Sequence, residues 1–100
     1  MGWATKYIEQ LSSGETVHFR PRGNSMSGKI ESGQLVTVKP AGNHRVEIGN
    51  IVLCKVNGTH YLHLVKAVSG ERFQIGNNRG RNNGWTARRN IFGIVVKIEE

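Results

Sequence analysis

A serine in a glycine-containing turn and a histidine in a later apolar segment are the residues of this sequence that could do chemistry together. Ser25 follows Gly23 and Asn24 and precedes Met26, shortly after a strand-like stretch. A serine in such a turn can expose its hydroxyl, while nearby backbone N–H groups, its own included, face a developing oxyanion. Because serine is a weak nucleophile, it needs a base within hydrogen-bond reach. A turn serine that bonds its own backbone is the structural alternative.

The candidate base is His63, which lies in the apolar run from Tyr61 to Val65. We expect this run to be buried, and burial disfavours the charged imidazolium. The ring would then stay neutral and able to accept a proton from the serine hydroxyl. A core histidine with satisfied hydrogen bonds is the structural alternative.

A cysteine near this histidine offers a second nucleophile. Asn57-Gly58 is a strong signal for a two-residue hairpin turn, because both residues readily adopt positive φ angles. Counting outward from the turn pairs Val52 with His63 and Cys54 with Tyr61. Cys54 would then share the face of His63, one diagonal step away. This geometry allows a Cys–His pair, although a lone strand cysteine is usually a small buried hydrophobe.

The histidines do not predict a metal site. His60 and His63 are three residues apart on a predicted strand, so their side chains would point to opposite faces. His18 and His44 add no recognisable ligand spacing. We therefore expect no bound metal and no cofactor.

The elements that must position these residues are a short helix and several short strands. Trp3, Tyr7 and Leu11 recur every four residues, which predicts an amphipathic helix over residues 1–14 with its apolar face docked on the core. Alternating or β-branched segments predict strands at 17–19, 35–38, 51–56, 59–68, 73–75 and 91–98, and a loop at 77–84. We expect one mostly β domain over residues 1–100, with its β core over 16–98.

Three segments together resemble the catalytic core of the LexA-repressor and signal-peptidase superfamily. GNSMSGKIESGQLVTV, from Gly23, is similar to a nucleophile motif G-x-S-M-x-P followed by G-D and a β-run. VEIGNIVLCKVNGTHYLHLVKAV is similar to the strand pair that carries the general base, and IGNNRGRNNGWTARRNIFGIVVKI to a G-D-N loop with its closing strand. The resemblance covers residues 17 to 98. It implies a standalone peptidase core in which Ser25 is the nucleophile, His63 is the base, and Gly23, Asn24 and Met26 form the nucleophile turn.

The chain departs from the family pattern at its proline and its acidic positions. Gly28 replaces the proline of the nucleophile motif, and the G-D turns read Gly33-Gln34 and Gly49-Asn50. The base is a histidine, which resembles the branch that includes the endoplasmic-reticulum signal peptidase, whereas most relatives have lysine. That branch has a G-D-N-N-x-x-D-D loop whose carboxylate would orient the histidine, but amides and arginines occupy residues 76–83 here. An unassisted Ser25–His63 pair would be slower than a triad, or catalytically silent.

The charge balance suggests a second kind of partner. Fourteen Lys and Arg against seven Asp and Glu give a formal net charge of +7, with a sequence pI near 10.2. Clustered arginines would suit phosphates or an acidic protein surface, while a solvated loop is the alternative. The candidate binding residues are Arg20, Arg22, Arg79, Arg81, Arg88 and Arg89.

Two functions follow from these features. The first is a soluble serine endopeptidase that uses a Ser25–His63 dyad on a peptide or protein substrate held along a strand edge. The second is a catalytically silent module of the same fold that binds nucleic acid or an acidic protein through its basic loop. No apolar run is long enough to span a bilayer, and one cysteine fits a reducing compartment, so we expect a cytoplasmic protein with no membrane partner.

Overall fold

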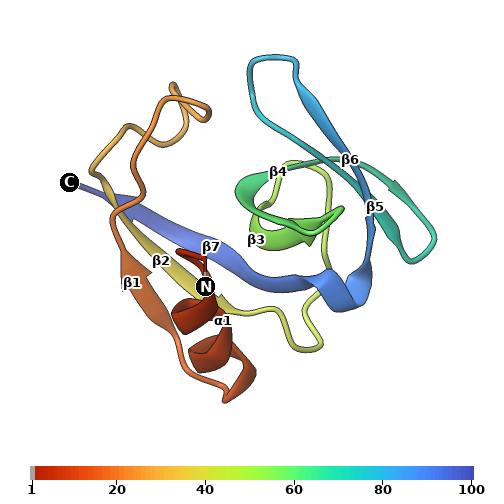
Figure 1. The fold of residues 1–100 in the computed structure, drawn as a ribbon, viewed down its shortest axis with the longest axis horizontal. Helices are drawn as coiled ribbons and strands as arrows, with labels where there is room; N and C mark the ends of the chain where they lie inside the picture. Colours follow the sequence, from red (N-terminus) through yellow and green to blue (C-terminus); the bar gives the residue numbers. More distant parts are fainter. Residues whose placement is uncertain (1) are drawn as a thin grey trace.

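Seven antiparallel strands form one sheet in the computed structural model of the chain, which describes residues 2–100 (Figure 1). Their order across the sheet is β1-β2-β7-β3-β4-β5-β6. The elements are α1 (Thr5–Ser12), β1 (Val17–Phe19), β2 (Leu35–Pro40), β3 (Ile51–Val56), β4 (Thr59–Ser69), β5 (Arg72–Gly76), β6 (Asn82–Ala87), the 3₁₀ turn η1 (Arg88–Asn90) and β7 (Ile91–Glu99). The prediction of a mostly β fold with one short N-terminal helix is confirmed.

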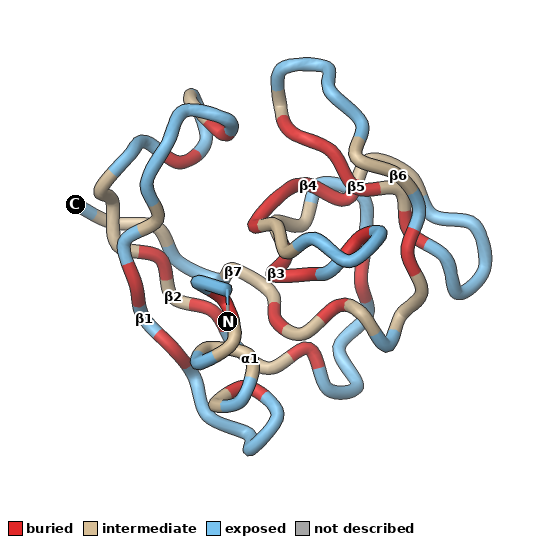
Figure 2. The backbone as a smooth tube through the Cα atoms, in the orientation of Figure 1, coloured by how far each residue is buried: buried red, intermediate tan, exposed pale blue. Residues whose placement is uncertain are grey.

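The hairpin of β3 and β4 is buried on both faces and joins two hydrophobic clusters. Leu53 and Leu62 belong to a first cluster with residues of α1, β1 and β2. Val52 and Cys54 belong to a second cluster with residues of β5 and β7. Figure 2 shows the resulting run of buried backbone through β3 and β4. A strand buried on both faces reads as a continuous apolar run, which explains why these segments show little alternation.

The register of this hairpin is the one that its turn predicts. Asn57 has a φ of 49° and Gly58 a φ of 84°, the positive values that a tight hairpin turn requires. Val52 pairs with His63 and Cys54 pairs with Tyr61. The predicted pairing is therefore confirmed, and it fixes the face of the sheet on which His63 lies.

The sixth strand was not predicted from the sequence. Residues 82–84 lie in the expected loop, yet they begin β6, which pairs with β5. This segment has no alternation of apolar and polar residues, so its extended form depends on the partner strand. The hydroxyl of Thr86 also donates to the backbone carbonyl of Lys55, 2.7 Å away, and so ties β6 to β3.

The helix is shorter than the predicted span of residues 1–14. It begins at Thr5, whose N–H bonds the carbonyl of Gly2 at 3.3 Å, and residues 13–14 form a turn beyond it. Leu11 is buried as expected, but Trp3 precedes the helix and is 52% exposed. Met1 lies outside the described residues. None of the described helical segments is long and apolar enough to cross a membrane.

Gly93 on β7 is the point at which α1 meets the sheet, so its replacement with alanine should destabilise the fold. An added Cβ would come within 2.5 Å of Val38 Cγ1 and 3.0 Å of Leu11 Cδ1. Overpacking of this kind costs about 1–3 kcal/mol of unfolding free energy. Urea denaturation measures the change, and the exposed Val96→Ala on the same strand is the control, with an expected change below about 0.5 kcal/mol. Equal stability of Gly93→Ala and wild type would contradict this packing.

Candidate active site

Ser25 lies on an exposed turn, and the next residue, Met26, anchors this turn in the core. Met26 is 5% exposed and packs in the first hydrophobic cluster, whereas Ser25 is exposed. The carbonyl of Met26 accepts hydrogen bonds from the N–H groups of Lys29 (2.9 Å) and Ile30 (2.8 Å), so the chain turns helically just after the serine. Asn24 closes the preceding bend by accepting from the Ser27 N–H at 3.2 Å. Residues 24–30 therefore form a hydrogen-bonded turn with Ser25 at its surface.

The backbone at position 28 favours glycine over the proline of the motif that this segment resembles. Gly28 has a φ of +95°, whereas proline is restricted to about −65°. The Gly28 N–H also donates to the carboxylate of Glu31 at 2.6 Å, a bond that proline could not make. This turn thus requires glycine where the family motif has proline.

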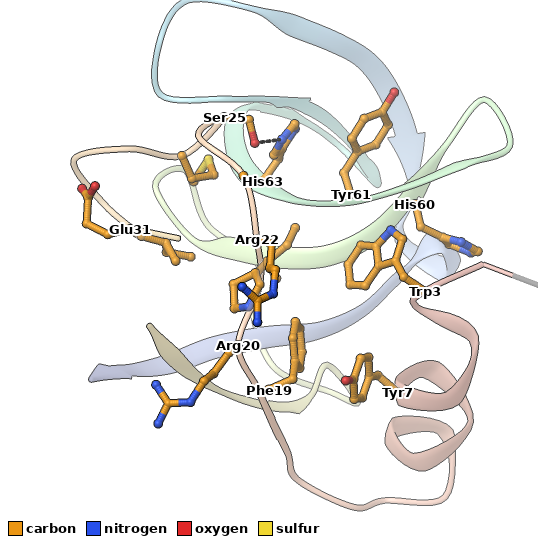
Figure 3. Close-up of a pocket in the computed structure, with 15 residues that line it drawn as sticks. Trp3, Tyr7, Phe19, Arg20, Arg22, Ser25, Glu31, His60, Tyr61 and His63 are labelled. Carbon is orange, nitrogen blue, oxygen red and sulfur yellow. Dashed lines mark hydrogen bonds between the residues drawn. The ribbon is translucent and has the colours of Figure 1, made fainter. Parts of the chain in front are cut away.

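His63 lies under the serine with a polar partner on each ring nitrogen. The side chain projects from β4 and is 7% exposed. Its Nε2 is 3.2 Å from Ser25 Oγ, and its Nδ1 is 2.7 Å from the amide oxygen of Asn83 (Figure 3 shows the first contact). An amide oxygen accepts hydrogen bonds, so it selects the tautomer that carries the proton on Nδ1. Nε2 then presents its lone pair to the Ser25 hydroxyl, which donates to it.

Asn83 contacts His63 but was not singled out from the sequence. It lies near the start of β6, the strand that was expected to be a loop, and reaches back to the ring of His63. The signal was present in the sequence, because Asn83 occupies the last acidic position of the family loop. The expectation of an unassisted pair is therefore wrong as regards orientation, since an amide holds the ring.

A second contact fixes the two loops of the site to each other. The loop after β5 and the loop that carries Ser25 project from the same side of the sheet (Figure 1). The side-chain N–H of Asn78 donates to the carbonyl of Ser27 at 2.6 Å. Within the first of these loops, the side-chain oxygen of Asn77 accepts from the N–H groups of Arg79 (2.9 Å) and Arg81 (3.0 Å). These amides therefore hold the site together.

The surroundings of His63 favour its neutral form. Burial lowers the pKa of His63 below its ordinary value of 6.5, the hydrogen bond that Nδ1–H donates to Asn83 raises it less, and the charge of Arg81 lowers it further. The ring of Tyr61 stacks on the imidazole with centroids 4.9 Å apart. A neutral, oriented imidazole is the state that a general base needs.

Cys54 is not an available nucleophile. It is fully buried in the second cluster as a free thiol. Burial raises the pKa of this thiol to about 12, so the thiolate does not form near neutral pH. The structure thus favours the small buried hydrophobe over the Cys–His pair.

A groove of about 460 Å³ runs beside the serine and the histidine. Its walls come from the N-terminal segment and α1, from the chain between Phe19 and Glu31, and from the start of β4 (Figure 3). Residues 59–63 of β4 pair with β3 on one side, while pairing with β5 begins at Leu64. The groove therefore follows a stretch of strand with one unpaired edge, and most of its lining is apolar or aromatic.

The six candidate arginines do not form one cluster. Arg20 and Arg22 line the groove beside Ser25, and Arg20 donates to the carbonyl of Gly33 at 2.8 Å. Arg88 and Arg89 line a separate groove of about 780 Å³. The Arg88 guanidinium is occupied there, since it donates to the carbonyls of Gly42 (2.8 Å) and His44 (3.0 Å). Arg79 and Arg81 are exposed on the loop after β5.

Among residues 2–100, no group of three or more His, Cys, Asp or Glu side chains is placed to hold a metal ion. No model of a known protein family matches the chain, and no curated protein matches it.

Replacing Asn83 with aspartate should raise the pKa of His63, because a carboxylate beside Nδ1 stabilises the imidazolium. An NMR titration of the imidazole signals, assigned with His63→Gln, measures the change. The matched control is Asn82→Asp, which adds the same charge one residue away. An equal rise in both variants, or in neither, would show that Asn83 does not contact the ring.

The same lowered pKa predicts a pH dependence of stability. The unfolded chain takes up a proton on this histidine at a higher pH than the folded chain does. The stability due to neutral His63 is therefore complete above about pH 6.5 and declines as the pH falls from there to the lower folded-state pKa. Urea denaturation at a series of pH values should show this decline in the wild type and a smaller one in His63→Gln. Identical pH profiles would contradict it.

Proposed function

We propose that this protein is a serine endopeptidase of the LexA and signal-peptidase type, with Ser25 as nucleophile, His63 as general base and Asn83 as the residue that orients the base. The observation that carries the proposal is the chain of two hydrogen bonds, 3.2 Å from Ser25 Oγ to His63 Nε2 and 2.7 Å from Nδ1 to Asn83. Geometry of this kind is how a serine–histidine site is recognised, whatever its position in the sequence.

The chemistry proceeds in two halves. Ser25 Oγ would attack the peptide carbonyl while its proton passes to Nε2 of His63, which gives a tetrahedral oxyanion and an imidazolium. The Ser25 N–H, at the mouth of the turn, would stabilise the oxyanion. The imidazolium would then protonate the leaving amine as the C–N bond breaks. Water, deprotonated by the same ring, would hydrolyse the acyl-serine and restore both residues.

The charges around the base set the expected speed and pH range. Asn83 can hold the ring in place, but an amide cannot neutralise the imidazolium as a carboxylate does. Arg81 also disfavours the charged ring. The enzyme should therefore be slower than a carboxylate triad, while its base remains unprotonated to a lower pH than an ordinary histidine.

The groove indicates how a substrate would bind. The unpaired edge of β4 at residues 59–63 lies along it and ends at the base. An extended peptide can form main-chain hydrogen bonds with such an edge, which fixes its register without regard to its sequence. The proposed substrate is thus an extended segment of a peptide or protein.

A binding function is the second candidate, and the net charge of +7 favours it. Arg22, Arg79, Arg81 and Arg89 are exposed, and they make up the part of the basic set that could meet phosphates or an acidic protein. Such binding to nucleic acid would weaken steeply with salt. A cytoplasmic location belongs to both proposals, because the free thiol of Cys54 suits a reducing compartment.

Ser25→Ala should abolish cleavage without changing the fold, because the exposed hydroxyl is removed from a turn that Met26 anchors. Loss of about 10³-fold or more is expected when a catalytic serine is removed. The assay is mass spectrometry of a mixture of unstructured peptides incubated with each protein. Ser69→Ala, which removes an exposed hydroxyl at the other end of β4, is the control and should cleave normally.

Two outcomes would contradict the peptidase proposal. One is cleavage that continues unchanged in Ser25→Ala, which would assign it to another residue or a contaminant. The other is a folded wild type that leaves every peptide in the mixture intact, which would shift the function to binding.

A further inference from the structure

We infer that the end of the groove remote from the serine is a specificity subsite for a large apolar side chain of the substrate, three or four residues from the cleaved bond, with an acidic residue preferred between the two. This inference rests on the proposed peptidase function and names the class of peptide that the site would select.

Three aromatic rings form the proposed subsite. Phe19 is buried, and Tyr7 stacks on it with ring centroids 4.3 Å apart and an interplanar angle of 16°. Trp3 leans on the same ring at 6.0 Å and 54°, yet 52% of its surface is exposed. All three line the groove (Figure 3). A half-exposed indole that packs against a buried ring is a surface on which a large apolar side chain gains contact at little entropic cost.

The distance from the subsite to Ser25 and His63 can be estimated along β4. His60 precedes the base His63 by three residues on β4, which is about 10 Å along an extended strand. Gly2 lies against His60, since a Cβ built on Gly2 would be 3.6 Å from its Nδ1. Trp3 is the next residue, and Figure 3 shows it beside His60. An extended peptide paired along β4 would therefore bring its third or fourth residue from the cleaved bond to the indole.

Arg22 supplies the charge preference. It lines the groove, and Figure 3 shows it between the Ser25–His63 pair and Phe19, on the side of the groove across from Trp3. The ion pairs among residues 2–100 are Arg45–Glu47 and Lys97–Glu99, so Arg22 has no carboxylate partner in the described chain. The carboxylate that does line the groove, Glu31, accepts the Gly28 N–H and lies on the side away from the indole. A substrate carboxylate would thus meet an unpaired guanidinium.

Cleavage of a randomised peptide library tests the subsite directly. Sequencing of the products should show large apolar residues enriched about tenfold over alanine and glycine at the third or fourth position on one side of the cut. Trp3→Ala should remove this enrichment. Trp85→Ala should retain it, because Trp85 is a comparably exposed indole on β6 that does not line the groove. Enrichment that persists in Trp3→Ala would overturn the assignment.

The same library tests the charge. Between the cleaved bond and the apolar position, the wild type should prefer Glu or Asp over Lys by about threefold. The preference is small because an ion pair between Arg22 and the substrate would be partly exposed. Arg22→Glu should reverse that preference, and the control Arg72→Glu, on exposed β5 surface, should leave it unchanged. An unaltered preference in Arg22→Glu would overturn this part of the inference.

A binding measurement separates failure of the subsite from failure of the peptidase. The chain has two tryptophans, so in Ser25→Ala/Trp85→Phe the emission of Trp3 alone reports occupancy of the groove. Cleavage with no preference at these positions would overturn the subsite and leave the peptidase standing. A second outcome is that no peptide is cleaved, but a peptide with acidic and large apolar residues gives a saturable change in Trp3 emission. A counterpart peptide with lysine and glycine at those positions would give no change. This outcome would overturn the peptidase and leave the subsite. Neither cleavage nor an emission change would overturn both.

Discussion

The register of the β3–β4 hairpin is the constraint from which the rest of the site follows. Side chains alternate between the faces of a strand, so a slip of one residue would exchange His63 with an apolar neighbour. The tight turn at Asn57-Gly58 fixes the register in which Val52 pairs with His63. The hairpin thus holds the His63 ring in one position, next to the turn that carries Ser25.

Around that ring, the Ser25 turn and the start of β6 supply the polar partners. The Asn78–Ser27 hydrogen bond joins the Ser25 turn to the loop that leads into β6. A buried imidazole needs partners for both nitrogens, and here the partners are a hydroxyl on one side and an amide on the other. An amide can orient the ring as a carboxylate does, but it does not stabilise the imidazolium. The proposed catalysis is therefore expected to be slow.

The sequence predicts those parts of the molecule whose structure is set locally. The hairpin register is an example, since the Asn57-Gly58 turn determines it within a few residues. β6 could not be predicted, because its residues become a strand only by pairing with β5, and Asn83 was missed with it. Arg88 illustrates a related limit: carbonyls brought to it by tertiary packing occupy its guanidinium, which its spacing along the chain does not reveal. Long-range pairing decides such roles, and spacing along the chain does not reveal it.

The most direct test of the central claim is labelling with a peptidyl fluorophosphonate, which phosphonylates an activated serine hydroxyl. If His63 activates Ser25, intact-mass measurement should show a single adduct, and peptide mapping should place it on Ser25. The labelling rate should rise with pH through the pKa of His63 and fall by about 10²-fold or more in His63→Gln, as expected when a general base is lost. An adduct on another residue, or equal rates in wild type and His63→Gln, would contradict the claim that this serine and histidine work as a nucleophile and its base.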